Sequence, residues 1–149
     1  MEIERKFLIK ELPEGYLNYP FRQIEQGYLC TEPVVRVRRE DSEYYLTYKS
    51  FGLLAREEYN LPLTRDSYDH LIAKADGNVL TKKRYLIPVE GDEGLTIELD
   101  VFEGKFQGLI LAEVEFESVK EANEFVPPAW FGEDVTMSGE YQNSRLSGL

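Results

Sequence analysis

Charged and apolar side chains alternate along the first residues of the chain, "MEIERKFLIK". Glu2, Glu4 and Lys6 are spaced two apart, and successive side chains of a β-strand point to opposite faces of a sheet. A strand here would place these three groups on one face and Ile3 and Phe7 on the other. Carboxylate oxygens bind hard divalent cations, and an ammonium group binds phosphate oxygens. The stretch could therefore hold a metal ion beside a phosphate group.

The same alternation recurs along the chain, with a sign of charge that depends on the segment. The segments "IELD" and "LILAEVEFE" offer carboxylates, whereas the middle of the chain offers cations. The candidate metal-ligating acids are Glu2, Glu4, Asp100, Glu113 and Glu115. The candidate phosphate-binding residues are Lys6, Arg36, Arg38, Lys49, Arg56, Lys82 and Arg84.

Two interpretations of these half-charged strands remain open. In an ordinary surface strand the charges face water and the apolar residues face the core. If the charged faces instead line one closed interior, the clustered carboxylates need cations, because close like charges raise each other's pKa. Mg²⁺ or Mn²⁺ would meet that need, and the cationic residues would bind the phosphates of a substrate bridged by the metal. Lys82, crowded by other cations, is then expected to have a lowered pKa.

The elements that must position these residues are mostly strands. Turn residues such as Pro13, Gly52 and Gly91 separate candidate strands, and the spacing of apolar residues in "TRDSYDHLIAKA" predicts a helix. Two shorter helices are expected, one from Ser118 to Phe125 and one after Ser138. The expected strands are Glu2 to Ile9, Arg22 to Leu29, Val34 to Arg39, Tyr44 to Ser50, Arg56 to Pro62, Leu80 to Val89, Leu95 to Phe102 and Leu109 to Ser118.

This arrangement predicts a mainly β member of the α+β class. Eight antiparallel strands would form a closed barrel with a few peripheral helices, because closure removes exposed strand edges. A barrel of this size can enclose one small ligand. The length of 149 residues and a hydrophobic content of 42% predict one domain over residues 1–149.

The amino-acid composition limits which metal ions and which binding partners are expected. A single cysteine, Cys30, and a single histidine make a thiolate or imidazole zinc site improbable, so any metal is expected to be oxygen-ligated. The net charge of -11 argues against binding to a nucleic-acid polymer. The sequence has no apolar run long enough to indicate export or membrane association, so we expect a cytoplasmic protein. We expect it to be a monomer or a homodimer and to act on a small molecule.

The charged segments resemble the CYTH superfamily, also called the triphosphate tunnel metalloenzymes. "EIERKFL" is similar to the E-x-E-x-K signature of this family, whose fold is an eight-stranded antiparallel barrel. The likeness continues in order through "IEQGYL", "VVRVRRE", "YLTYKS", "REEYNLPL", "TKKRY", "IELDVFEG", "LAEVEFES" and "PPAWFGEDVT". The resemblance therefore extends over nearly the whole chain.

The resemblance implies hydrolysis or cyclisation of triphosphates with Mg²⁺ or Mn²⁺, with two ions expected. It adds Glu58 to the metal-ligating acids, and it implies a catalytic pair in the tyrosine of Q-G-Y-L and the first lysine of K-x-R-Y, here Tyr28 and Lys82. Two of the positions that depart from the family pattern bear on the charges of the site. Asn60 stands where relatives often carry a glutamate, and Glu140 stands where they often carry a basic residue.

The expected activity is hydrolysis of tripolyphosphate to pyrophosphate and phosphate. No additional segment that could recognise a nucleobase is evident, which favours an inorganic substrate. The alternatives are a class IV adenylyl cyclase that converts ATP to cyclic AMP and pyrophosphate, a thiamine triphosphatase, and a non-catalytic protein that binds polyphosphate or nucleotide.

Overall fold

A computed structural model describes residues 1–92 and 94–149 of the chain. The described residues form ten strands, three α-helices and two short 3₁₀ turns, at Tyr16–Asn18 and Gly104–Phe106. The helices are α1 (Arg65–Ile72), α2 (Val119–Glu124) and α3 (Asn143–Ser147). The strands are β1 (Glu2–Ile9), β2 (Phe21–Thr31), β3 (Val34–Glu40), β4 (Glu43–Lys49), β5 (Ala55–Arg56), β6 (Glu58–Pro62), β7 (Asp76–Pro88), β8 (Thr96–Phe102), β9 (Ile110–Phe116) and β10 (Phe131–Asp134).

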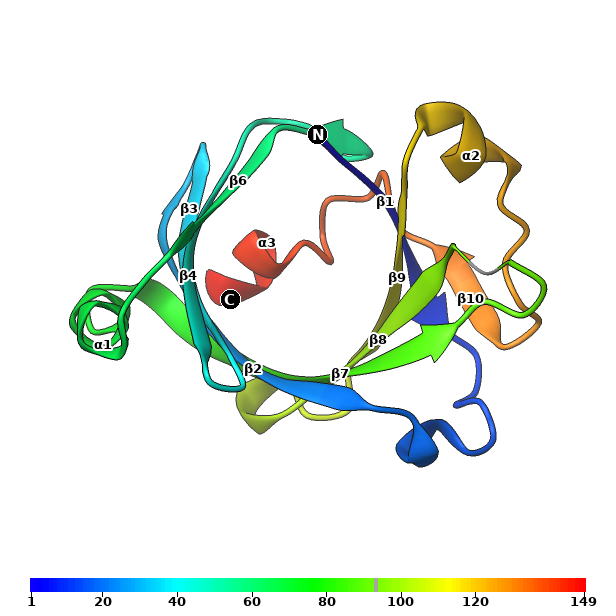
Figure 1. Cartoon of the computed structure of the whole chain (residues 1–149), viewed down its shortest axis with the longest axis horizontal. Coiled ribbons are helices and arrows are strands. Elements are labelled where there is room, and N and C mark those ends of the chain that lie inside the picture. The colour runs from blue at the N-terminus through cyan, green and yellow to red at the C-terminus, as the bar shows by residue number, and fades with distance from the viewer. Residues whose placement is uncertain (93) are drawn as a thin grey trace.

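The strands form one antiparallel sheet that curls into a nearly closed barrel (Figure 1). Its order is β10-β1-β9-β8-β7-β2-β3-β4-β6, so two meanders, β2-β3-β4 and β7-β8-β9, meet where β2 pairs with β7. The predicted barrel is confirmed, and seven of the eight predicted strands are each a single strand of the structure.

The predicted strand from Arg56 to Pro62 is interrupted at Glu57, which leaves β5 and β6 as separate elements. β6 pairs with β4, whereas β5 pairs with Glu2 and Ile3 of β1. This short pairing joins the two ends of the curled sheet. The same edge of β1 pairs with β10 further along, at Phe7 and Ile9, and this occupies the rest of that edge. The sequence analysis did not predict β10, which has only four residues.

The main apolar core lies against the outer face of the barrel wall. Alternate residues of the strands, among them Phe7, Leu99 and Val114, are buried there together with Ala122 of α2 and Phe131 of β10. α2 and β10 lie outside the ring of strands (Figure 1). Because the apolar faces are covered from outside, the opposite faces of the same strands are left to line the lumen.

α1 covers the outside of the wall formed by β2 and β3. Thr64 caps it in a capping box with Ser67, and the buried Tyr68 donates a hydrogen bond to Glu25 at 2.8 Å. Gly27 of β2 allows the residues that follow α1 to lie close to this strand, because a Cβ at Gly27 would be only 2.7 Å from the Cβ of Ala75. The helix predicted from "TRDSYDHLIAKA" is thus confirmed, and it lies at the periphery.

α3 is not peripheral, in contrast to our expectation for all the helices. It lies inside the ring of strands (Figure 1). Its Leu146 is 4% exposed and packs in an apolar cluster with Tyr28, Val34, Leu80 and Leu111. This cluster accounts for the position of the helix, because burying the leucine side chain removes apolar surface from water. Among the described residues, no helix combines the length and apolarity that crossing a bilayer requires.

Candidate functional site

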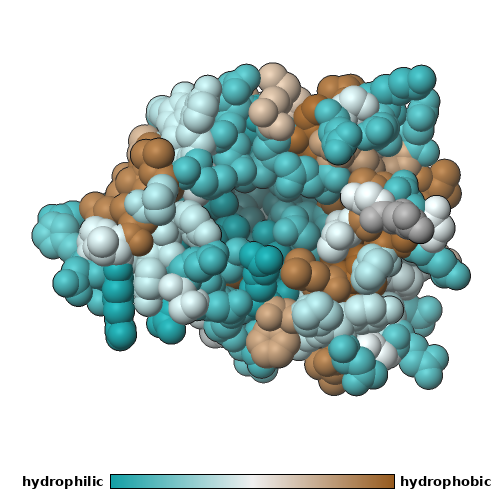
Figure 2. Space-filling model, viewed as in Figure 1, coloured by the Kyte–Doolittle hydropathy of each residue, from teal (hydrophilic) through white to brown (hydrophobic). Residues whose placement is uncertain are grey.

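The barrel lumen contains a cavity of about 330 Å³ that is lined mainly by charged groups. Figure 2 shows a hydrophilic hollow at the centre of the face seen in Figure 1. Two of the predicted site residues, Lys82 and Asp100, are fully buried and do not line this cavity. The predicted site residues that do line it are Glu2, Glu4, Lys6, Tyr28, Arg36, Arg38, Lys49, Arg56, Glu58, Arg84, Glu113 and Glu115.

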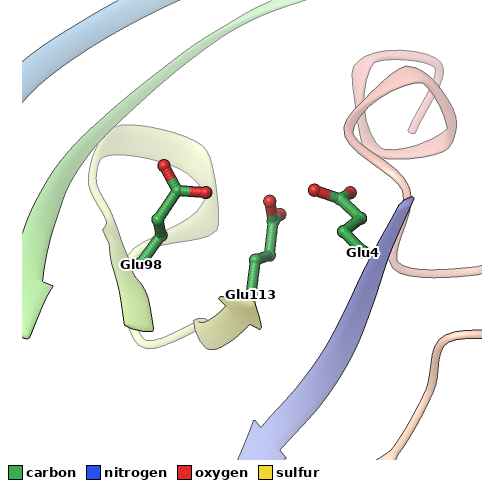
Figure 3. A group of neighbouring side chains, drawn as sticks. All are labelled: Glu4, Glu98 and Glu113. Carbon is green, nitrogen blue, oxygen red and sulfur yellow. The ribbon is translucent and has the colours of Figure 1, made fainter. Parts of the chain in front are cut away.

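Three carboxylates converge in the lumen from three adjacent strands. Glu4 of β1, Glu98 of β8 and Glu113 of β9 each offer an oxygen, and these oxygens lie within 4.8 Å of one another (Figure 3). Strand register explains the convergence, because Glu113 is paired with Lys6 of β1 and with Glu98 of β8. Glu98 was not among the predicted metal ligands. The sequence feature that could have identified Glu98 is its spacing of two from Asp100 in "IELD", which places both side chains on one face of the strand.

The electrostatics of this carboxylate group favour a bound cation. Burial, and then the charges of Glu113 and Glu2, raise the pKa of Glu4 to about 8. Burial opposes ionisation of Glu113, but the charges of Lys6 and Arg84 outweigh it and hold its pKa well below the ordinary value. Within the described chain, Glu113 Oε1 accepts no hydrogen bond, although Lys6 Nζ lies 3.3 Å away. An oxygen-only donor set with an unsatisfied buried oxygen fits a hard divalent cation.

Glu2 and Glu58 are engaged with cations at the start of β1 and β6. Lys49 Nζ lies 2.9 Å from both carboxylate oxygens of Glu2 and 3.2 Å from Glu58, and Arg56 Nε lies 3.4 Å from Glu2. Burial raises the pKa of Glu58, but hydrogen bonds with Glu2 and Asn60 and the charge of Lys49 lower it overall to about 2. Both carboxylates are therefore held as partners of cations in the lumen.

Asp100 positions two cations and does not face the cavity. Its carboxylate accepts a 2.7 Å hydrogen bond from Lys82 Nζ and bonds of 2.8 and 2.9 Å from the Arg84 guanidinium. Burial lowers the pKa of Lys82 to about 8, with Asp100 opposing this shift and Arg84 adding to it. The lowered pKa of Lys82 agrees in direction with the prediction, but its largest cause is burial and not the charge of the neighbouring cations.

Arg36 and Arg38 of β3 form a cationic wall on the opposite side of the ring from β8 and β9 (Figure 1). Arg38 Nε donates a 2.8 Å hydrogen bond to Gln26, and burial together with the charges of Arg36 and Arg84 lowers the Arg38 pKa to about 10. Arg36 is 6% exposed, and its Nε has no hydrogen-bond partner among the described residues. A buried guanidinium N–H without a partner is costly, so this wall is suited to an anionic ligand.

Tyr28 is 2% exposed and lies in the lining of the cavity. Its hydroxyl accepts a long hydrogen bond, 3.5 Å, from Gln26 Nε2. The described residues show no hydrogen bond between Tyr28 and Lys82, so the two members of the predicted catalytic pair are not directly linked. Glu115 is exposed on β9, where burial and nearby carboxylates, Glu2 first among them, raise its pKa.

The C-terminal segment contributes lining residues that the sequence analysis did not single out. Gln142, Asn143 and Ser144 line the cavity, whereas Glu140 is exposed and does not. The carbonyl oxygen of Tyr141 accepts a 3.0 Å hydrogen bond from Lys6 Nζ. Glu140, the position at which this segment departs from the family pattern, therefore lies outside the cavity lining.

A nearly closed antiparallel barrel, with carboxylates of β1, β8 and β9 in its lumen opposite the arginines of β3, defines a class of proteins with a charged tunnel. Comparison with known proteins places the chain within this class, because residues 1–148 match the CYTH domain. The chain belongs to the CYTH domain family.

Two relatives are similar along nearly their whole length. The chain is 41% identical over 150 residues to an inorganic triphosphatase of Nitrosomonas europaea, covering 98% of this chain and 96% of the relative. It is 35% identical to an inorganic triphosphatase of Acetivibrio thermocellus, covering 97% of this chain and 92% of the relative. A crystal structure of an inorganic triphosphatase superposes with a TM-score of 0.73 at 36% identity, covering 99% of this chain and 94% of that one.

Proposed function

We propose that this protein is a divalent-metal-dependent inorganic triphosphatase that hydrolyses tripolyphosphate to pyrophosphate and phosphate. The observation that carries the proposal is the charged lumen, whose lining combines the carboxylates of Glu4, Glu98 and Glu113 with the guanidinium groups of Arg36 and Arg38. Both curated relatives described above are inorganic triphosphatases, which supports the same assignment.

The metal would be held by Glu4, Glu98 and Glu113. We propose Mg²⁺ or Mn²⁺, since both prefer oxygen ligands. Two ions are proposed, and the further predicted ligands Glu2, Glu58 and Glu115 lie in the same cavity lining. When bound, such ions neutralise phosphate charge and lower the pKa of a coordinated water molecule.

The cations of the lumen would bind and orient the phosphate chain. Arg36 and Arg38 offer forked donors that match phosphate oxygens, and they would stabilise the charge that develops during phosphoryl transfer. Lys6, Lys49, Arg56 and Arg84 lie in the same lining. Phosphoryl transfer depends chiefly on such positioning and charge stabilisation, so this set suits the reaction.

The proton transfer is assigned to Lys82 and Tyr28. A lysine whose pKa is lowered to about 8 can accept a proton at the amine near neutral pH. Asp100 would fix the position of Lys82 Nζ through their 2.7 Å hydrogen bond. Conversion of Lys82 to methionine should lower kcat by at least about a hundredfold, which is the range of general acid-base catalysis.

The assay is hydrolysis of tripolyphosphate by the purified protein with Mg²⁺ or Mn²⁺, with the products resolved by ³¹P NMR. We expect pyrophosphate and phosphate in equal amounts, and loss of turnover in Glu113→Gln. Binding without turnover under either metal would indicate a non-catalytic binding protein. Cyclic AMP from ATP, or faster hydrolysis of thiamine triphosphate, would replace the proposed activity with one of the alternatives.

We also propose that the protein acts in the cytoplasm as one domain, as a monomer or a homodimer. Its substrate would be a small molecule, without a nucleic-acid polymer or a membrane as partner. Cell fractionation and sedimentation of the purified protein test these assignments, and recovery in a membrane fraction would contradict them.

A further inference from the structure

Asn143 lies between the most deeply buried lysine of the site and the charged cavity. Its Oδ1 accepts a 3.2 Å hydrogen bond from Lys82 Nζ, while its side chain also belongs to the cavity lining. Lys82 is 0% exposed and does not reach that lining. In the C-terminal segment, Asn143 is therefore the residue that lies between Lys82 and the cavity.

The hydrogen bond with Lys82 fixes the orientation of the Asn143 amide. Lys82 Nζ donates to both Asp100 and Asn143 Oδ1, and both the charged and the neutral lysine have the two N–H groups this requires, so the carbonyl end of the amide faces it. The amide nitrogen, with its two donors, must then point away from Lys82. Among the hydrogen bonds of the described residues, none has this nitrogen as its donor, so its N–H groups remain for a ligand in the cavity.

The backbone around Asn143 is held in place on both sides. Lys6 Nζ donates to the carbonyl of Tyr141, and Leu146 is anchored in the apolar cluster with Leu80 and Leu111. Asn78 Nδ2 donates a 3.1 Å hydrogen bond to the carbonyl of Ser147. An amide on a fixed backbone costs little further ordering when it binds a ligand.

We propose that Asn143 is a substrate-contacting residue, whose Nδ2 donates a hydrogen bond to a phosphate oxygen of the bound chain. This inference rests on the proposed function and deepens it, because it assigns a neutral hydrogen-bond donor for the substrate to the C-terminal segment that lines the lumen. A neutral donor adds no charge to a lumen already rich in cations. The ligand is identified by its chemistry as an inorganic phosphate chain.

The substitution Asn143→Asp separates substrate contact from a purely structural role. Aspartate keeps an acceptor for Lys82 and would strengthen that interaction, so the fold should tolerate it. It removes the donor and places a negative charge against the phosphate chain. Asn143→Ala removes both functions without adding charge. Glu140→Gln is the matched control, because Glu140 is exposed in the same segment and lies outside the cavity lining.

The experiment measures tripolyphosphate binding by calorimetry and KM and kcat with saturating Mg²⁺. We expect Asn143→Ala to weaken binding and raise KM about tenfold, as for loss of a hydrogen bond to a charged acceptor. Asn143→Asp should weaken binding further, with a thermal unfolding midpoint no lower than that of the wild type. Glu140→Gln should match the wild type in every measurement.

Binding by Asn143→Asp equal to that of the wild type would overturn the inference and leave the proposed function intact. If Asn143→Asp fails to fold, the KM and binding of Asn143→Ala decide. Binding of tripolyphosphate by the wild type without turnover would overturn the proposed function, while the variants would still test the contact. A wild type that neither binds nor hydrolyses it overturns both.

Discussion

At the scale of single residues, Arg36 and Arg84 show how the surroundings of a buried charge indicate its role. Arg84 makes hydrogen bonds to Asp100 and Glu98, and these bonds balance the cost of burying its charge. Arg36 is equally buried, yet its Nε has no partner in the described part of the chain. Both arginines line the cavity, but Arg84 is expected to contribute more to the stability of the fold and Arg36 more to ligand binding.

Methionine substitutions test this distinction. Arg84→Met should lower the free energy of unfolding by about 3 kcal/mol, because it removes one partner of a buried ion pair. Arg36→Met should leave it unchanged or raise it, since a buried N–H group without a partner disappears, while tripolyphosphate binding weakens about tenfold or more. Urea denaturation and calorimetry measure the two quantities. Equal destabilisation by both variants would contradict the assignment.

Glu4 gives a prediction for the pH dependence of stability in metal-free protein. Its pKa is raised from 4.5 to about 8, chiefly by burial, so the folded state binds a proton that the unfolded state has lost across this range. Its stabilising contribution is therefore present below about pH 4.5 and is lost as the pH rises through about 8. Glu4→Gln should flatten the pH profile of the unfolding free energy in this window.

Urea unfolding at a series of pH values, in the presence of a chelator, measures this effect. Added Mg²⁺ should restore stability to the wild type at pH 8 more than to Glu4→Gln, because the ion replaces the lost proton. Parallel pH profiles for the two proteins would show that Glu4 does not titrate in this range.

At the scale of elements, strand alternation predicted most of what the structure contains. The charged face of "MEIERKFLIK" and that of "VVRVRRE" both line the lumen, because side chains of a strand alternate between its faces. Alternation could not distinguish Glu98 from Asp100, which share a face but occupy different depths. That difference depends on the register of β7, β8 and β9, which one sequence does not reveal.

The position of α3 was also beyond the sequence analysis. The segment after Ser138 predicted a helix, but nothing in its short pattern indicated that Leu146 would pack inside the barrel. Long-range packing of this kind depends on the apolar residues that other strands present, here Val34, Leu80 and Leu111. The neutral lining residues of this segment were missed for the same reason.

Gly77 provides a test of the position of α3. It has a φ of 67°, and a Cβ there would lie 2.1 Å from the carbonyl oxygen of Ser147. Gly77→Ala should therefore displace α3, weaken tripolyphosphate binding and lower the free energy of unfolding by more than about 1 kcal/mol. Trypsin cleavage after Arg145 should also become faster.

The matched control is Gly91→Ala. Gly91 has a similar φ of 83° but has no atom within 4 Å of an added Cβ among those described, so it isolates the backbone cost from the clash. Equal cleavage rates and binding in the two variants would indicate that α3 does not depend on the close approach at Gly77.

At the scale of the whole molecule, the barrel reverses the usual placement of polar and apolar residues. The main apolar core lies outside the wall under α2 and β10, and the lumen holds the charges. A protein with a net charge of -11 can in this way offer a cationic surface to an anion. A charged cleft with low-dielectric walls governs binding more than the total charge does.

The most direct test of the central claim is anomalous diffraction from crystals soaked with Mn²⁺ and the slowly hydrolysed analogue imidotriphosphate. The account predicts manganese among the carboxylates of Glu4, Glu98 and Glu113, with phosphate oxygens against Arg36 and Arg38. Manganese and phosphate on the outer surface, with the lumen holding only water, would contradict it.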